Sequence, residues 1–567
     1  MEIFDMSSKL GRKKEQTESI FTTGYRFFAQ LVDYIICIYL LLIIVAMPFY
    51  YQREQGYKTI GTSKYLFFRW TIEHTGQLLL PVLVCLAFCG VVRIRKEKER
   101  SMAVCLKTWA ASFTITDMFA LLYGCSVLIS YAASNYKDTA LWGANGWYMG
   151  LIPQLVSVLA YFCISRLWER RDWIFLLLLP VSAVVFGLGI LNRFGCYPID
   201  MQLERADFIS TIGNINWYCG YLVSVFFAGV YLLWQKTETS LEVLGQPRTV
   251  QMQIKCKRVL LILYVAVGFA ALVTQGSMSG FLALGAVLLA LFCMSADSGR
   301  RMWVFWQLVL ILAVVCMALW GIRTRFPAQM TFSDAVTDLF TDSMLPVGLA
   351  MLAIFFLLLV GWMNRRGRYS VKLFRGLTGI VFCATAFLFV AVVGMIAWNT
   401  KYPGSLGSLS QNEFFTFSPT WGSNRGATWQ AGLMCLKEEN MLQRLIGVGP
   451  DSMEAFINDA GSEQLHTMIT ERFMNLRLTN AHCEWLSIWI NMGLLGCVSY
   501  GGMMISAIIC FLRDKKGNTV IAGACGLCVL AYTVNNIVSF QQSMSLATIF
   551  VVLGMGRAYQ AARRKKG

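Results

Sequence analysis

The chain has 567 residues, of which 56% are hydrophobic and 14% charged, and its formal net charge is +17. A soluble protein of this length could not cover so much apolar surface with so few charges. Runs of about 20 apolar residues, each long enough to cross a ~30 Å hydrocarbon core, recur along the chain. These runs are continuous and do not alternate with polar residues, which excludes a β-barrel. The composition therefore predicts an all-α integral membrane protein.

The apolar runs predict about 14 transmembrane helices. They are expected at residues 27–49, 77–92, 109–131, 149–165, 173–191, 210–234, 259–275, 280–295, 303–321, 343–363, 376–398, 484–512, 519–537 and 544–560. The short pair at 259–275 and 280–295 could instead be re-entrant. The chain then divides into a tail (1–26), a membrane domain with about 11 spans (27–398), a large loop (399–481), three C-terminal spans (482–560) and a second tail (561–567).

The placement of Lys and Arg predicts the orientation. If the N-terminus is cytoplasmic, 34 of these residues fall in cytoplasmic segments and 15 in outer segments, which accounts for all 49. This asymmetry follows the positive-inside rule, and it predicts that both termini are cytoplasmic and that the large loop is extracytoplasmic. The positive charge is then a consequence of topology, so anionic membrane lipids, and not nucleic acid, are the expected partner. The polar, basic residues 1–26 show no cleavable signal peptide.

The large loop contains an amphipathic stretch, and a loop of this length with its own helices is more often functional than a spacer, although a passive cap is the alternative. The 18 cysteines lie mostly inside the predicted spans and fit as small apolar fillers. The three histidines, His74, His466 and His482, are scattered, and no HExxH motif occurs. No metal site and no cofactor are therefore expected.

Two outer segments carry polar residues that would be unfavourable on a surface in contact with lipid. Asn214 and Asn216 lie inside an apolar run. Unpaired amides are costly in lipid, so they should face the bundle, either in interhelical hydrogen bonds or in a wet cavity. Arg205 lies just above them at headgroup level, where a snorkelling anchor is the alternative. The turn TQGSMSG (274–280) has two glycines whose neighbouring N–H groups could face a ligand, but an ordinary hairpin turn fits it better.

Two further outer segments carry titratable groups. A helix is expected to start near Arg425 and to end before the GVGP of residues 447–450. An arginine in the first turn opposes the helix dipole, which suggests that it serves an anion; a solvated surface arginine is the alternative. His482 precedes the apolar helix from Glu484, and an imidazole there could accept a proton at neutral pH or merely anchor the interface. Because these four segments fall on one side of the membrane, they favour an extracytoplasmic site.

These residues also carry a family resemblance. His482-Cys483, then nine residues, Gly493, two residues and Gly496 resembles the signature of the O-antigen ligase and O-antigen polymerase superfamily, in which Asn, Ser or Gln usually follows the histidine. "SNRGATW" followed by "GVGP" is similar to the family's Arg-x-x-x-Trp helix and G-x-G turn. "STIGNINWYCGYL" resembles the start of one of its middle spans. "SMSG" has Met278 where many members have arginine, and three spans follow the large loop as they do in the family.

The resemblance implies a GT-C-like glycosyltransferase of the bacterial cytoplasmic membrane. Such an enzyme moves a glycan from a polyprenyl (undecaprenyl) diphosphate carrier to a lipid or glycan acceptor hydroxyl in cell-surface polysaccharide synthesis, without nucleotide sugar or metal. His482 would deprotonate or orient the acceptor hydroxyl, and Arg425, with Arg205 as second candidate, would bind the diphosphate. The residues that would support the substrate site are Asn214, Asn216, Trp429, Gly493 and Gly496. The two glycines are expected on one helix face, where they would allow close packing or admit the isoprene tail.

Three rivals stay open. A flippase or exporter of lipid-linked oligosaccharide should line a mid-membrane cavity with charges and usually has repeated halves. Asp33 and Asp117 are the only clear intramembrane carboxylates, and no repeat is visible. A non-catalytic scaffold for envelope assembly is the second rival. A protein O-oligosaccharyltransferase shares the donor chemistry of ligases and polymerases and differs in its acceptor, which the sequence does not display. The enzyme hypothesis requires Arg425 and His482 to reach one substrate.

Overall fold

The computed structural model describes residues 20–96, 104, 107, 110–202, 205–235, 248–329, 335–473, 477–513 and 519–564. Within these ranges, eleven helices are long and apolar enough to cross a membrane. Strand structure in the same ranges is limited to one antiparallel pair, β1 (Phe208–Ile209) and β2 (Gly213–Asn214). The prediction of an all-α, multi-pass membrane protein is therefore confirmed, and helices are expected there because a backbone in lipid must satisfy its own hydrogen bonds.

Each of the fourteen predicted spans coincides with a helix or with two or three helices in direct succession. These are α2 (Ile20–Leu41) with η1 (Leu42–Ala46) and α3 (Met47–Phe49), α4 (Ile60–Lys96), α6 (Ile115–Ala133), α8 (Leu151–Leu167), α9 (Asp172–Leu176) with α10 (Leu178–Arg193), α11 (Ile215–Gln235), α13 (Arg248–Thr274), α14 (Met278–Ser295), α15 (Gly299–Arg325), α17 (Leu345–Arg365), α18 (Val371–Lys401), α23 (Glu484–Leu512), α24 (Val520–Asn535) and α25 (Ser543–Arg564). The eleven long apolar helices include all of these except α8, α24 and α25.

One span differs from the expectation in a way that the chain explains. α4 has 37 residues and starts well before the predicted span at 77–92. Its first half is polar, so hydropathy alone did not reveal it, and Lys64 is buried there because its Nζ donates to the carbonyls of Met47 and Pro48, at 2.8 Å each. The possible re-entrant pair is two helices, α13 and α14, each long and apolar enough to cross a membrane.

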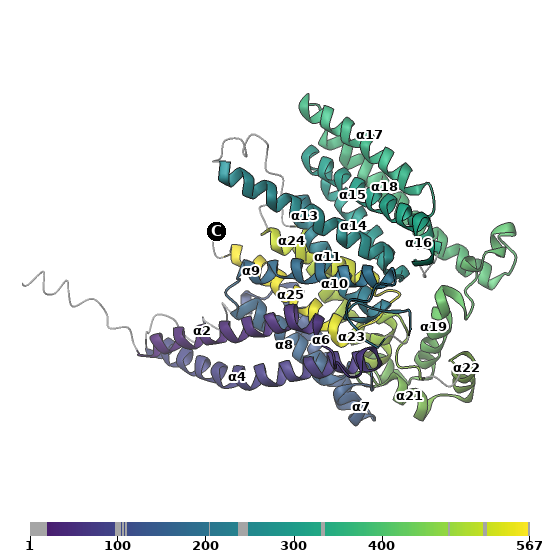
Figure 1. Cartoon of the computed structure of the whole chain (residues 1–567). Coiled ribbons are helices and arrows are strands. Elements are labelled where there is room, and N and C mark those ends of the chain that lie inside the picture. Colours follow the sequence, from purple (N-terminus) through teal and green to yellow (C-terminus); the bar gives the residue numbers. More distant parts are fainter. Residues whose placement is uncertain are drawn as a thin grey trace, which may run out of the picture.

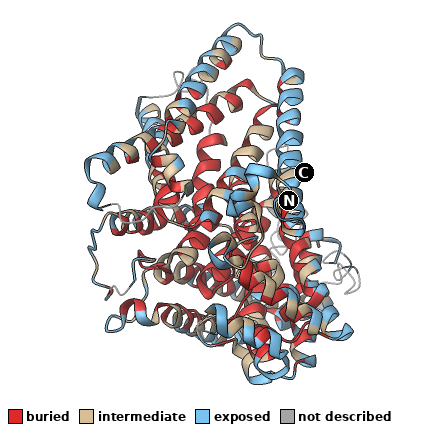
Figure 2. Cartoon of the chain, turned by 90° about the vertical axis from the view of Figure 1, so that its right-hand side faces the viewer, coloured by how far each residue is buried: buried red, intermediate tan, exposed pale blue. Residues whose placement is uncertain are grey.

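The helices are packed around α11, which is almost completely buried and contacts α10, α13, α24 and α25. α2 and α4 lie side by side at one edge, and α15, α17 and α18 form a group at another (Figure 1). Figure 2 shows the buried residues gathered in the interior of the bundle. In contrast to α11, the apolar part of α18 has no buried residue, as expected for a helix whose surroundings are lipid.

The segment between α18 and α23 is itself helical, with α19 (Trp421–Glu438), α20 (Met441–Ile446), α21 (Met453–Ala460) and α22 (Glu463–Phe473) after two short 3-10 turns, η4 (Gly407–Gln411) and η5 (Glu413–Phe415). α19, α21 and α22 lie together at one end of the bundle (Figure 1). The segment has a small apolar core that includes Cys435, Phe456 and Leu465 and that Ile490 of α23 completes. It is therefore docked on the N-terminal end of α23.

Candidate active site

The four polar segments singled out in the sequence meet at one end of the bundle. They surround a cavity of ≈ 260 Å³, which we name the Arg425 cavity. Its walls come from the start of α11, the turn before α14, the start of α19, the end of α22 and His482. The lining residues are Ile215, Asn216, Gly276, Ser277, Met278, Ser423, Asn424, Arg425, Thr428, Phe473 and His482. Their convergence is a tertiary feature, since they are far apart in the sequence.

Arg425 is held in the wall of this cavity by backbone carbonyls. Gly422, Ser423 and Asn424 have left-handed backbones, so the regular part of α19 starts at Arg425 as predicted. The guanidinium donates from Nε to the Val538 carbonyl at 2.8 Å and from Nη1 to the Gly422 carbonyl at 2.9 Å. Burial lowers the pKa of Arg425, and no carboxylate among the described residues forms an ion pair with it. A partly desolvated cation without a counter-ion is a site for an anion.

His482 faces the same cavity. Its backbone is left-handed (φ 50°), and its N–H donates to the side-chain oxygen of Asn480 at 2.9 Å. The ring packs against Phe540 edge to face, with centroids 4.7 Å apart, and makes no hydrogen bond to a described residue. Burial, and secondarily the charge of Arg425, lower the pKa of His482 to about 4. The imidazole is therefore neutral at pH 7 and belongs to a residue in the cavity wall.

The turn between α13 and α14 contributes hydroxyl and amide groups. The Ser277 hydroxyl donates to the side-chain oxygen of Asn216 at 2.9 Å, and the Ser277 N–H donates to the side chain of Gln275 at 2.7 Å. Arg193 at the end of α10 donates to the Gln275 carbonyl at 2.6 Å, which links the turn to α10. The turn lines the cavity, and it also joins α13 to α14 as the hairpin turn that the sequence favoured. Met278 lines the cavity, and among the described residues that line it Arg425 is the only cation.

Five of the candidate residues do not line the Arg425 cavity, and the first three are Arg205, Asn214 and Trp429. The Arg205 side chain is 70% exposed and is paired with Asp207 through two contacts of 2.9 Å. Asn214 donates to the same carboxylate and accepts the N–H of Asn216, so it acts on the site only through Asn216. Trp429 packs against Trp421, with ring centroids 5.6 Å apart. Arg205, the second candidate for binding the diphosphate, therefore does not lie in the same cavity as Arg425, the first candidate.

Gly493 and Gly496 are also outside the cavity, and the expectation that they share one regular helix face is wrong. Gly493 has φ 67° and ψ −175°, which interrupts α23. This interruption frees the carbonyls of Ile490 and Asn491, which accept the N–H groups of Val448 and Gly449 at 3.0 Å each. Gly447 and Gly493 let the two backbones approach, because a Cβ at either position would overlap backbone atoms of the other segment. The glycines join the GVGP turn to α23.

The sequence interpretation missed the loop between α24 and α25, residues 536–542, which positions both Arg425 and His482. The loop supplies the Val538 carbonyl to Arg425 and the Phe540 ring to His482. Cys483, at the N-cap of α23, provides no side-chain cap; instead the N–H of Glu484 donates to the carbonyls of Asn536 (3.0 Å) and Ser539 (2.8 Å). The polar run "NNIVSFQQ" between two apolar spans was the available signal.

Besides the 536–542 loop, the sequence interpretation did not assign a role to Glu484. Its carboxylate is 2% exposed and accepts hydrogen bonds from four neutral donors, which are the side chains of Tyr500, Tyr532, Asn536 and Gln541. Two of these donors belong to the 536–542 loop. Since buried charged groups need several hydrogen bonds, Glu484 fixes the loop that in turn holds the Arg425 cavity.

Comparison with known proteins adds no family to this description. No protein-family model matches the chain, and no curated protein matches it. Within the described part of the chain, no group of three or more His, Cys, Asp or Glu side chains could hold a metal ion. The fold and the site therefore define a multi-pass helical membrane protein with a polar cavity that contains one guanidinium and one neutral imidazole.

Proposed function

We propose that the protein is a GT-C-like membrane glycosyltransferase with fourteen spans, both termini in the bacterial cytoplasm and the Arg425 cavity on the extracytoplasmic face. It moves a glycan from a polyprenyl diphosphate carrier to an acceptor hydroxyl in cell-surface polysaccharide synthesis. The observation that carries the proposal is the presence of Arg425 and His482 in the wall of one cavity, beside the hydroxyl of Ser277 and the amide of Asn216. The resemblance of the His482–Gly496 and Arg425–Pro450 segments to O-antigen ligases and polymerases supports the same chemistry.

In this reaction the acceptor oxygen bonds to the anomeric carbon of the donor glycan while the bond from that carbon to the diphosphate oxygen breaks. The diphosphate leaves with additional negative charge, which Arg425 stabilises with the N–H groups that the Val538 and Gly422 carbonyls do not occupy. His482 takes the proton of the acceptor hydroxyl. The incoming diphosphate also offsets the charge of Arg425, which is the smaller of the two causes that lower the pKa of His482, so donor binding makes the imidazole a stronger base.

The chain's own segments would shield this chemistry from water. α19 and α22 supply Arg425, Thr428 and Phe473 to the cavity, so the segment between α18 and α23 covers the site on one side. Exclusion of water limits hydrolysis of the carrier and strengthens the interaction of Arg425 with the diphosphate. No cofactor enters the mechanism.

Complementation of a strain that lacks the gene tests the proposal. Arg425→Ala and His482→Ala should each lower glycan transfer at least ~100-fold, because a charge stabiliser and a general base typically contribute 10²–10⁴. Arg205→Ala is the matched control: it removes an arginine that is exposed and paired with Asp207, so transfer should stay near the wild-type level. Membrane levels of the three variants are compared by immunoblot. Full activity of either cavity variant would remove that residue from the mechanism.

Glycan analysis of the deletion strain separates the related activities. Short chains on the normal acceptor indicate a polymerase, carrier-linked polymer with a bare acceptor indicates a ligase, and loss of protein-linked glycan indicates a protein O-oligosaccharyltransferase. Carrier-linked glycan retained on the cytoplasmic side would instead show a flippase or exporter and would contradict the proposal.

A further inference from the structure

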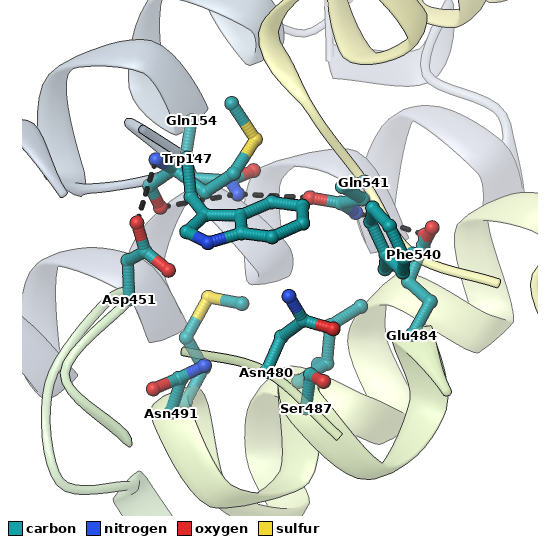
Figure 3. A pocket seen from close by; sticks show the side chains of 12 residues that line it. Trp147, Gln154, Asp451, Asn480, Glu484, Ser487, Asn491, Phe540 and Gln541 are labelled. Carbon is teal, nitrogen blue, oxygen red and sulfur yellow. Dashed lines mark hydrogen bonds between the residues drawn. The ribbon is translucent and has the colours of Figure 1, made fainter. Parts of the chain in front are cut away.

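A second, smaller cavity lies beside the Arg425 cavity. Its volume is ≈ 40 Å³, and Trp147 and Phe540 form part of its wall (Figure 3); we name it the Trp147 cavity. The Phe540 ring contacts Trp147 on one side and His482 on another, with centroids 4.7 Å apart in both pairs. His482 lines the first cavity and Phe540 lines the second, so this pair of rings lies between the two cavities.

Asp451 is one of the polar residues that line the Trp147 cavity. Asp451 is 7% exposed, and one carboxylate oxygen accepts the N–H groups of Ala144 at 2.8 Å and Met149 at 2.9 Å. The other oxygen has no hydrogen-bond partner among the described residues, and Figure 3 shows it on the side of the indole ring of Trp147. A carboxylate oxygen that faces a cavity and has no protein donor is available to accept a hydrogen bond from a ligand hydroxyl.

Amide donors complement this acceptor. The side-chain oxygen of Asn491 accepts the N–H groups of Ser452 and Met453 at 2.9 Å each, which fixes the amide and leaves its NH₂ group without a partner in the described chain. Asn480 uses its oxygen for the N–H of His482, and its NH₂ group has only a long contact of 3.4 Å to Thr479. In Figure 3, Asn480 and Asn491 lie below the indole ring, as does Ser487.

We propose that the Trp147 cavity is the subsite for one sugar residue of the acceptor glycan, an inference that rests on the proposed glycosyl transfer. Sugar hydroxyls both donate and accept, so they match a carboxylate oxygen next to amide donors, and the C–H face of a pyranose fits an aromatic ring. The volume is that of about three water molecules. The cavity therefore takes the hydroxyl edge of one ring while the rest of the sugar lies against Trp147.

The position of the cavity assigns it to the acceptor and not to the donor. The donor diphosphate binds at Arg425, on one side of the His482–Phe540 pair, and the Trp147 cavity lies on the other. A hydroxyl that approaches His482 from the Trp147 side is placed to attack the anomeric carbon opposite the leaving diphosphate. It follows that the acceptor is itself a glycan, as in polymerases and ligases, and not a protein side chain.

Saturation-transfer difference NMR on the full chain in a sugar-free detergent tests the subsite without any transfer reaction. The probes are methyl glycosides of glucose, galactose, rhamnose and N-acetylglucosamine, with glycerol as the polyol control. We expect at least one glycoside, but not glycerol, to give a difference signal. Asp451→Asn keeps an oxygen for the Ala144 and Met149 N–H groups and turns the cavity-facing oxygen into a donor. At pH 8, where Asp451 is mostly ionised, this substitution should weaken the binding about tenfold, as loss of a hydrogen bond to a charged group does.

Asp459→Asn is the matched control, because Asp459 is exposed on α21 and only accepts a bond from Tyr136; its signal should equal that of the wild type. No signal from any glycoside, or an equal signal in Asp451→Asn, overturns the proposal. Geranyl-diphosphate N-acetylglucosamine supplies the donor arm: we expect it to bind together with the glycoside, and displacement of the glycoside would overturn the assignment to the acceptor. Binding of geranyl diphosphate to the wild type and to Arg425→Ala tests the proposed function separately, so the two failures are distinguishable.

Discussion

Replacement of Gly493 by alanine is the sharpest structural prediction. At φ 67° and ψ −175°, Gly493 has a backbone conformation that is essentially restricted to glycine. An added Cβ would overlap the carbonyl of Leu445 and the amide nitrogen of Ile446. Since these are backbone atoms and not the end of a flexible side chain, α20 and the following turn would have to move away from α23.

The cost can be worked out from the contacts. The strained backbone costs about 1–3 kcal/mol in a non-glycine residue. Movement of α20 breaks the bonds from the Val448 and Gly449 N–H groups to α23, at about 1 kcal/mol each. The local stability of this junction should therefore fall by about 3–5 kcal/mol, which is roughly a 10²- to 5 × 10³-fold faster amide exchange.

Hydrogen exchange measured by mass spectrometry on peptides that cover residues 445–453 checks this expectation. Gly285→Ala is the control, since Gly285 lies in α14 and an added Cβ there meets nothing within 4 Å; its exchange should match the wild type. Wild-type protection of residues 445–453 in Gly493→Ala would refute the role given to this glycine. Disruption of the junction should also abolish glycan transfer, because Asp451 and Asn491 lie on its two sides.

The remaining predictions concern buried ionisable groups. Glu484→Gln places an amide donor against neighbours that all donate to Glu484, so exchange in the 536–542 loop should rise at least ~10-fold and transfer should fall, whereas unchanged exchange would show that Glu484 does not hold the loop. In ¹⁵N-histidine-labelled protein, which has only three histidines, His482 should titrate with a pKa of about 4; Arg425→Met should raise this pKa only partly, since burial is the larger cause, and no rise would contradict the contact. Burial raises the pKa of Asp451 from 3.8 to about 7, so the folded state loses stability as the pH rises between these values. Asp451→Asn should therefore stabilise the protein by up to about 4 kcal/mol above pH 7 and by less than half of that at pH 5, which thermal unfolding at pH 5 and pH 8 will show; equal shifts at the two pH values would argue against an ionised Asp451.

Much of the fold could be predicted from the order of residues. Long apolar runs become helices because lipid offers no hydrogen bonds to a backbone, and this holds whatever the neighbours are. The start of the regular part of α19 at Arg425 and the break at GVGP were also predictable, because glycine and proline act locally. The prediction of one helix between them was wrong, because α19 ends at Glu438 and the Asn440 side chain caps a second helix, α20. The polar half of α4 was missed, because a helix that is buried through Lys64 needs partners in α3 that hydropathy does not show.

Some features of the candidate site also follow from the sequence, and others follow only from the tertiary structure. The sequence by itself determined which chemical groups are available, an arginine, a histidine and several amides near the ends of apolar spans. Tertiary structure decided which of them meet: Arg425 and His482 share a cavity, while Arg205 is held by Asp207 at the surface. It also decided that Gly493 interrupts a helix and that the 536–542 loop supports the site. These features depend on contacts between residues far apart in the chain, and the short-range patterns of a sequence do not contain such contacts.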